Sequence, residues 1–131
     1  LKFKMNNFLL IGLFAAIGTW LRWLINIAFT ALLPGLPLGI LAVNLLGGLL
    51  MGISISFFQH LNDISEEIRL AINIGFMGGL TTFSAYTADI FQLMQTGDFM
   101  IALLLACAHV IGALSFCYLG FYLTNLSLRS F

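Results

Sequence analysis

The stretch Gly78-Gly79-Leu80-Thr81-Thr82-Phe83-Ser84-Ala85-Tyr86 decides the fold of this chain. It lies inside residues 68–94, which are otherwise apolar enough to cross a bilayer. A pair of glycines and three Ser and Thr hydroxyl groups interrupt that apolar run. At membrane depth, non-helical backbone is tolerated only where it is buried in protein or lines a water-filled cavity. Broken membrane helices hold ions at their exposed backbone ends, so the stretch predicts an ion site.

The composition of the whole chain predicts an all-α membrane protein. The 131 residues are 61% hydrophobic and only 8% charged, and the mean hydropathy is +1.08. A soluble domain carries about 25% charged residues. Because one transmembrane helix needs about 20 apolar residues, the chain forms a single transmembrane domain over residues 1–131 with no room for a soluble one. Its net charge is zero, so no nucleic-acid partner is expected.

The apolar runs predict four transmembrane helices, over about residues 8–33, 38–58, 68–94 and 99–125. The segment Pro34-Gly35-Leu36-Pro37 and the turn around Gly97 separate neighbouring runs, as Pro and Gly typically do. With four spans, both ends of the chain and the middle connection lie on the same side of the membrane.

The orientation in the membrane is left open by the basic residues. Lys2, Lys4, Arg69 and Arg129 favour a cytoplasmic location for the side that carries both chain ends. However, Met5 could be the true start, in which case residues 1–4 do not count. The remaining bias is weak, as expected for a protein that inserts both ways round.

Glycine spacing predicts close contact between helices. Gly35-x-x-x-Gly39 and Gly48-x-x-x-Gly52 match the spacing that lets two helix backbones approach each other in lipid. Packing inside one chain and a dimer interface both remain possible.

Arg22 is the one basic residue inside an apolar run. A guanidinium in hydrocarbon costs about 2.5–3.5 kcal/mol even on a mild insertion scale, so Arg22 must snorkel, pair or face water. Trp20 and Trp23 beside it favour an anchor at the membrane interface. The alternative is a cation at the vestibule of a pore.

Asn44, Phe83 and Tyr86 are candidate contacts for an anion. The Asn44 amide can donate two hydrogen bonds and accept at its oxygen, so it serves as a link between helices, as a donor along an anion path, or as both. Phe83 and Tyr86 are three residues apart, on one face if a helix resumes after the interruption. The positive edges of aromatic rings can solvate a small anion, and Tyr86 adds a hydroxyl.

Three further polar residues lie in the third and fourth spans. His109 is expected to be a packing histidine that bonds across helices. Asp89 faces a vestibule or pairs with a basic group, and Ser115 is a polar candidate on the last span. No nucleophile, base and orienting group form a recognisable set, so an enzyme is not expected.

The interruption resembles the signature of the CrcB/Fluc family of fluoride channels, with residues 78–84 lying halfway along the third of four predicted helices. The Gly18-x-x-x-Arg22 pattern, Asn44 followed by Gly47, and the chain length fit as well. The resemblance implies a fluoride-selective channel that exports fluoride passively across the bacterial inner membrane. It also implies an antiparallel, dual-topology homodimer with a central sodium ion.

The resemblance also implies roles for particular residues. The sodium ligands would be the main-chain carbonyls of Gly78 and Thr81. The chain departs from the family at Tyr86, where a second Phe is usual. The implied fluoride pathway consists of Asn44, Phe83, Tyr86, Ser84, Thr82, Arg22 and Ser115.

Two alternative functions belong to other classes. A small dual-topology cation or drug exporter needs a carboxylate in its first span, but residues 8–33 contain no Asp or Glu and Asp89 is the only candidate. A non-catalytic membrane assembly subunit would explain the glycines. It would not explain why Asn44 accompanies a polar interruption.

Overall fold

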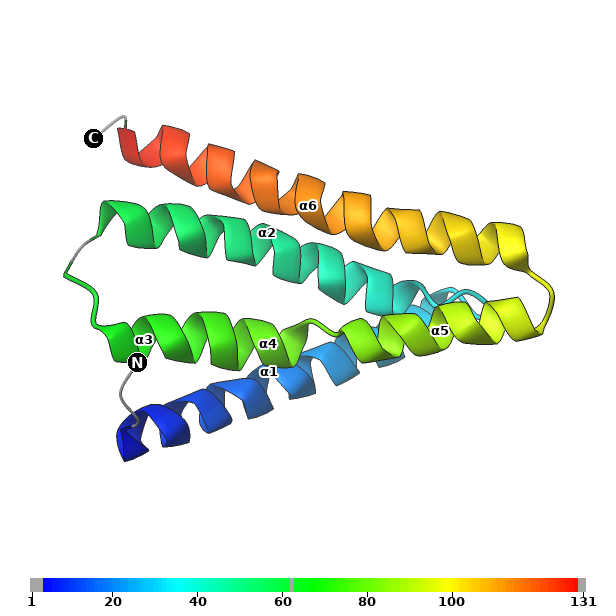
Figure 1. Ribbon diagram of the computed structural model, residues 1–131, viewed down its shortest axis with the longest axis horizontal. Helices are drawn as coiled ribbons and strands as arrows, with labels where there is room; N and C mark the ends of the chain where they lie inside the picture. Colours follow the sequence, from blue (N-terminus) through cyan, green and yellow to red (C-terminus); the bar gives the residue numbers. More distant parts are fainter. Residues whose placement is uncertain (1–3, 62, 130–131) are drawn as a thin grey trace.

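The computed structural model, which describes residues 4–61 and 63–129, is a bundle of helices that run side by side along one long axis (Figure 1). Three helices are long and apolar enough to cross a membrane. They are α1 (Met5–Leu32), α2 (Leu38–His60) and α6 (Phe99–Arg129). All regular elements among the described residues are helical, so the chain is an all-α, multi-pass membrane protein.

The third pass along the bundle is built from several short segments (Figure 1). Thr81 and Thr82 separate the last two of them and have extended backbone, with φ of −84° and −153°. The glycine pair that precedes them stays helical. The segments are α3 (Glu66–Leu70), the π-helical turn η1 (Ala71–Phe76), α4 (Met77–Leu80) and α5 (Phe83–Gln95).

Glycines with positive φ make the turns at one end of the bundle. Gly35, with φ of 98°, lies between α1 and α2, and Gly97, with φ of 87°, lies between α5 and α6. Glycine adopts this left-handed conformation without a steric penalty. Gly35 therefore belongs to a connection, and the Gly35-x-x-x-Gly39 spacing does not form one helix face. The start of α1, the end of α6 and the α2–α3 connection lie at the opposite end (Figure 1).

Helices α2 and α6 touch through their backbones. A Cβ on Gly52 would collide with the carbonyl oxygen of Cys117, and one on Gly120 would collide with that of Leu49. A Cβ on Gly48 would come within 2.6 Å of another α6 carbonyl oxygen. Gly48 and Gly52 thus serve packing inside the chain, one of the two possibilities that their spacing left open.

Helix α1 packs in the same way against the third pass. A Cβ on Gly79 would collide with the carbonyl oxygen of Ala15, and one on Gly18 would collide with that of Phe76. Small residues on both sides let the two backbones approach closely. This contact positions the middle of α1, which carries Arg22, beside the end of α4.

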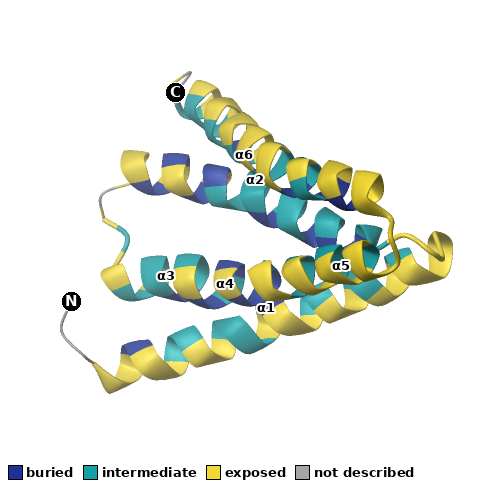
Figure 2. Cartoon of the chain, turned by 45° about the vertical axis from the view of Figure 1, so that its right-hand side comes forward, coloured by how far each residue is buried: buried dark blue, intermediate teal, exposed yellow. Residues whose placement is uncertain are grey.

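Burial follows the inside of the bundle, and the outer faces are apolar and exposed (Figure 2). Val43 on α2 and Leu80 on α4 have no exposed surface. The exposed aliphatic and aromatic side chains suit a surface that faces lipid. Helix α5 differs from the other long helices because none of its residues is buried.

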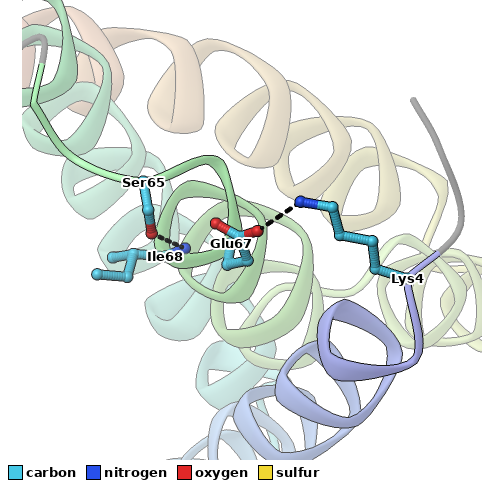
Figure 3. A network of polar contacts seen from close by, with 4 residues as sticks. All are labelled: Lys4, Ser65, Glu67 and Ile68. Carbon is cyan, nitrogen blue, oxygen red and sulfur yellow. Dashed lines mark hydrogen bonds and ion pairs between the residues drawn. The ribbon is translucent and has the colours of Figure 1, made fainter.

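A polar cluster ties the start of α1 to α3 at one end of the molecule (Figure 3). Lys4 Nζ lies 2.9 Å from Glu67 Oε1, and Ser65 Oγ caps α3 by accepting from the Ile68 N–H at 3.4 Å. The hydrogen bond and the opposite charge raise the pKa of Lys4 and lower that of Glu67. Both groups are exposed to solvent, where such pairs contribute little to stability.

Candidate functional site

The side chain of Asn44, which lies on α2, forms two hydrogen bonds with the backbone of Thr82. Asn44 Nδ2 donates to the Thr82 carbonyl oxygen at 3.0 Å, and the Thr82 N–H donates to Asn44 Oδ1 at 2.9 Å. The amide therefore satisfies both polar groups of a residue that has left the helix. Buried or membrane-embedded backbone groups need such partners, so Asn44 is the reason that extended backbone is tolerated at this depth.

The carbonyl of Gly78 loses its helical partner as a result. In an α-helix, the N–H of residue i donates to the carbonyl of residue i−4, and for Gly78 that donor would be Thr82. The Thr82 N–H donates to Asn44 instead. Gly78 is exposed, and no atom outside its chain neighbours and its own helix backbone lies within 4 Å of the position that a Cβ would occupy. The carbonyl that has lost its helical donor thus belongs to an exposed residue.

Arg22 reaches the interruption from α1. Its Nη1 donates to the Thr81 carbonyl oxygen at 3.0 Å, so the guanidinium is paired within the bundle. A cation is favourable there because Thr81 follows the carboxyl end of a helical segment, where the backbone dipole is negative. Trp20 and Trp23 flank Arg22 and are both exposed. Of the three possibilities for Arg22, the structure shows pairing.

The side chain of Thr82 starts α5. Its Oγ1 accepts from the Ala85 N–H at 3.3 Å, the standard N-cap contact. The Ser84 Oγ lies 3.1 Å from the same oxygen. The amino end of a helix has a positive dipole that favours anions. Two hydroxyl groups therefore lie beside backbone that is electrostatically suited to negative charge.

A groove of about 360 Å³ runs past the interruption and is lined by residues of α2, α5 and α6. The rings of Phe83 and Tyr86 have centroids 5.2 Å apart, and the ring of His109 lies 4.5 Å from that of Tyr86. Asn44 and Thr82 also line the groove. Its wall thus combines aromatic rings, one amide and the hydroxyl-bearing residues Thr81, Thr82 and Tyr86 in an otherwise apolar setting.

The groove contains part of the set of residues that the resemblance implied. It brings together Asn44, Thr82, Phe83 and Tyr86. Ser84 contacts Thr82, and Arg22 contacts the interruption from the α1 side. Ser115 is exposed on α6 and does not line the groove.

His109 is a groove residue that the sequence did not reveal. Its side chain is 4% exposed, and Nδ1 donates to the Leu105 carbonyl oxygen at 3.0 Å, within its own helix and not across helices. Among residues 4–61 and 63–129, Nε2 is buried without a hydrogen-bond partner. The available signal was a titratable ring inside an apolar run. Its partner on α5, Tyr86, could only be identified in the fold.

Asp89 lies outside this groove. It lines a separate cavity of about 180 Å³ together with Gln92 and Thr96. In the described part of the chain, Asp89 forms no ion pair, and its Oδ2 is buried without a partner.

Comparison with known proteins identifies the family. The family model described as "CrcB-like protein, Camphor Resistance (CrcB)" matches residues 9–121. The chain belongs to the CrcB-like family. The matched region includes all four passes of the bundle, the interruption and the Asn44 contact.

Several curated relatives carry the name "Fluoride-specific ion channel FluC". The protein from Ralstonia pickettii (strain 12J) is 43% identical over 116 residues, which cover 88% of this chain and 92% of the relative. Relatives from Ralstonia nicotianae (strain ATCC BAA-1114 / GMI1000) and Cupriavidus pinatubonensis (strain JMP 134 / LMG 1197) are 41% and 42% identical over the same shares of each chain. The similarity therefore extends over nearly the full length of these proteins.

Proposed function

We propose that this chain is a fluoride-selective channel of the bacterial inner membrane that lets fluoride leave the cell passively. Two observations support the proposal. The relatives that match most of the chain are named fluoride-specific channels. An amide, hydroxyl-bearing residues and aromatic residues line one groove beside the interruption.

The chemistry of the groove suits a small, strongly hydrated anion. A selective pore must replace the water around the ion with donors and still bind weakly enough to release it. The Thr82 and Ser84 hydroxyls and the second N–H of the Asn44 amide are neutral donors. The ring edges of Phe83 and Tyr86 add a partial positive charge. None of these groups carries a full charge that would trap fluoride.

The same proposal includes a sodium ion and a second copy of the chain. The Gly78 carbonyl lacks its helical donor, and the Thr81 carbonyl keeps one lone pair after accepting from Arg22. Both are hard oxygen ligands, and unwound carbonyls bind sodium in transporters. Two ligands are too few for one ion, so an antiparallel partner would contribute the same pair. The sodium would supply a fixed positive charge near the anion path.

Fluoride efflux tests the proposal directly. Purified protein in proteoliposomes loaded with fluoride should release it down its gradient, as followed with a fluoride electrode. Empty vesicles correct for the leakage of HF through lipid. Efflux no faster than that of empty vesicles, from folded protein, would refute the channel.

A matched pair of variants tests the groove. Phe83→Leu removes a ring that lines the groove, and Phe91→Leu removes an exposed ring from the same helix outside it. We expect Phe83→Leu to slow efflux at least about tenfold, which corresponds to a barrier about 1.4 kcal/mol higher, and Phe91→Leu to leave efflux unchanged. Equal rates for the two variants would remove Phe83 from the pathway.

A further inference from the structure

We propose that Asn44 is a positioning residue whose acceptor oxygen keeps the Gly78 carbonyl free to bind a cation. This role differs from that of a direct fluoride donor, and it rests on the sodium site of the proposed function. It assigns the amide oxygen and one amide N–H of Asn44 to the backbone of the interruption, and it leaves the second N–H for the permeating ion.

The argument begins with competition for one hydrogen. Two acceptors can compete for the Thr82 N–H. One is the Gly78 carbonyl, which would accept it in a continuous helix, and the other is Asn44 Oδ1. The structure shows it 2.9 Å from Asn44 Oδ1. Whichever acceptor wins decides whether α4 continues into α5. It also decides whether the Gly78 oxygen has a partner inside the chain.

The second hydrogen bond of the Asn44 amide holds Thr82 in the extended conformation. Asn44 Nδ2 donates to the Thr82 carbonyl at 3.0 Å, so the Asn44 side chain pairs with both the N–H and the C=O of Thr82, as a neighbouring strand would. This pairing holds Thr82 at φ −153° and ψ 128°, in the extended region. One amide therefore sets the backbone conformation of the residue that separates the two helices.

Removal of this acceptor has a definite structural consequence. At membrane depth a backbone N–H needs a partner, and helix closure supplies one within the chain. Without Asn44, the Thr82 N–H is satisfied by the Gly78 carbonyl, and the interruption closes into a helix. Extended residues rise about 3.3 Å each and helical ones 1.5 Å. Closure over Thr81 and Thr82 therefore shortens the third pass by about 3–4 Å.

Electron-spin distance measurements test the closure without reference to any ion. Nitroxide labels at Ile68→Cys and Phe91→Cys, both exposed sites, span the interruption in a background without Cys107 and Cys117. Dilution with unlabelled chains isolates the distance within one chain. We expect Asn44→Leu to shorten this distance by about 3–4 Å. Asn44→Asp should leave it unchanged, because the neutral carboxylic acid that burial favours keeps an acceptor oxygen for the Thr82 N–H and an O–H donor for the Thr82 carbonyl.

The control is another asparagine inside the bundle. Asn73 on η1 accepts from Ser54 Oγ at 2.6 Å and precedes Thr81 by eight residues, about two helical turns. Asn73→Leu should keep the distance of the unmodified chain. An unchanged distance in Asn44→Leu would overturn the inference, and so would an equal shortening in Asn44→Asp or in Asn73→Leu.

Thermal unfolding in sodium and in N-methylglucamine provides the second measurement. The unmodified chain, Asn44→Asp and Asn73→Leu should unfold at a higher temperature in sodium, since a ligand that binds only the folded state stabilises it. Asn44→Leu should show no such difference. A full sodium effect in Asn44→Leu would contradict the inference. If no variant responds to sodium, the sodium site of the proposed function is wrong, while the spin distances still decide the role of Asn44.

Discussion

Thr82 follows Thr81, the C-cap of α4, and begins α5 as its N-cap. Its backbone pairs with Asn44, and its Oγ1 accepts from the Ala85 N–H at the start of α5. The first N–H groups of a helix have no partner within the helix. The hydroxyl of Thr82 therefore stabilises α5 independently of any role that it has toward an ion.

Replacement of the hydroxyl tests this capping role. We expect Thr82→Val, which has the same shape, to lower the free energy of unfolding by about 1 kcal/mol, while Thr82→Ser keeps most of the stability. Unfolding in detergent by heat or denaturant provides the measurement. Equal stability of the two variants would show that the 3.3 Å contact with Ala85 contributes nothing.

Sequence reasoning placed some site residues correctly and could not place others. The spacing of Phe83 and Tyr86 predicted one helix face, and their rings lie 5.2 Å apart. That relation is local, so the helical repeat determines it. The pairing of Arg22 with the Thr81 carbonyl and the contact of His109 with Tyr86 depend on how distant helices align. No local pattern carries that information.

At the scale of the elements, α2 and α6 form the most extensive contact between two elements in the described part of the chain. Gly52 and Gly120 each lie against a carbonyl oxygen of the other helix. Since lipid gives helices no hydrophobic reason to associate, this contact depends on backbone proximity. A methyl group at either glycine would force the two helices apart.

A pair of alanine substitutions measures that dependence. We expect Gly52→Ala to destabilise the fold by about 1–3 kcal/mol, the usual range for overpacking. Gly12→Ala, at a position with no atom within 4 Å outside its chain neighbours and its own helix backbone, should have no destabilising effect, because alanine favours helix over glycine by up to about 1 kcal/mol. Denaturant unfolding in detergent compares them. Similar losses in both variants would argue against a tight α2–α6 contact.

The details of the third pass illustrate where prediction from sequence stops. Apolar runs indicated the passes, because lipid exposure is visible in composition. The glycine pair looked like the start of the interruption, but Gly79 is helical and packs against Ala15. The extended residues are Thr81 and Thr82, since Asn44 withdraws the Thr82 N–H from the helix. The π-helical turn at 71–76 had no recognised signal.

At the scale of the whole molecule, one copy leaves α5 and the Gly78 carbonyl uncovered. Helix α5 has no buried residue, the Phe83 side chain is 77% exposed, and the Gly78 carbonyl has lost its helical donor. Hydrocarbon does not satisfy such groups. The proposed antiparallel partner would cover this face, and it would bring a second set of the same carbonyls to the first.

Dual insertion is the testable part of that assembly. A reactive tag at the carboxyl end of the chain should be labelled by impermeant reagents from both sides of the membrane. Lysines appended after the tag should shift all labelling to the cytoplasmic side, because basic residues are retained there. Labelling of the unmodified chain from one side alone would contradict dual topology. Any dimer would then consist of parallel copies.

The open surroundings of Gly78 have a consequence for genetics. No atom outside its chain neighbours and its own helix backbone lies within 4 Å of the position that its Cβ would occupy, and its φ is not positive. A single copy of the chain therefore accommodates alanine at position 78, and alanine has the higher helix propensity. If cells that carry Gly78→Ala fail to grow under fluoride selection, the lost fitness reports a constraint imposed from outside the chain. Such a result would indicate that a second copy or a bound ion lies against Gly78 in the cell.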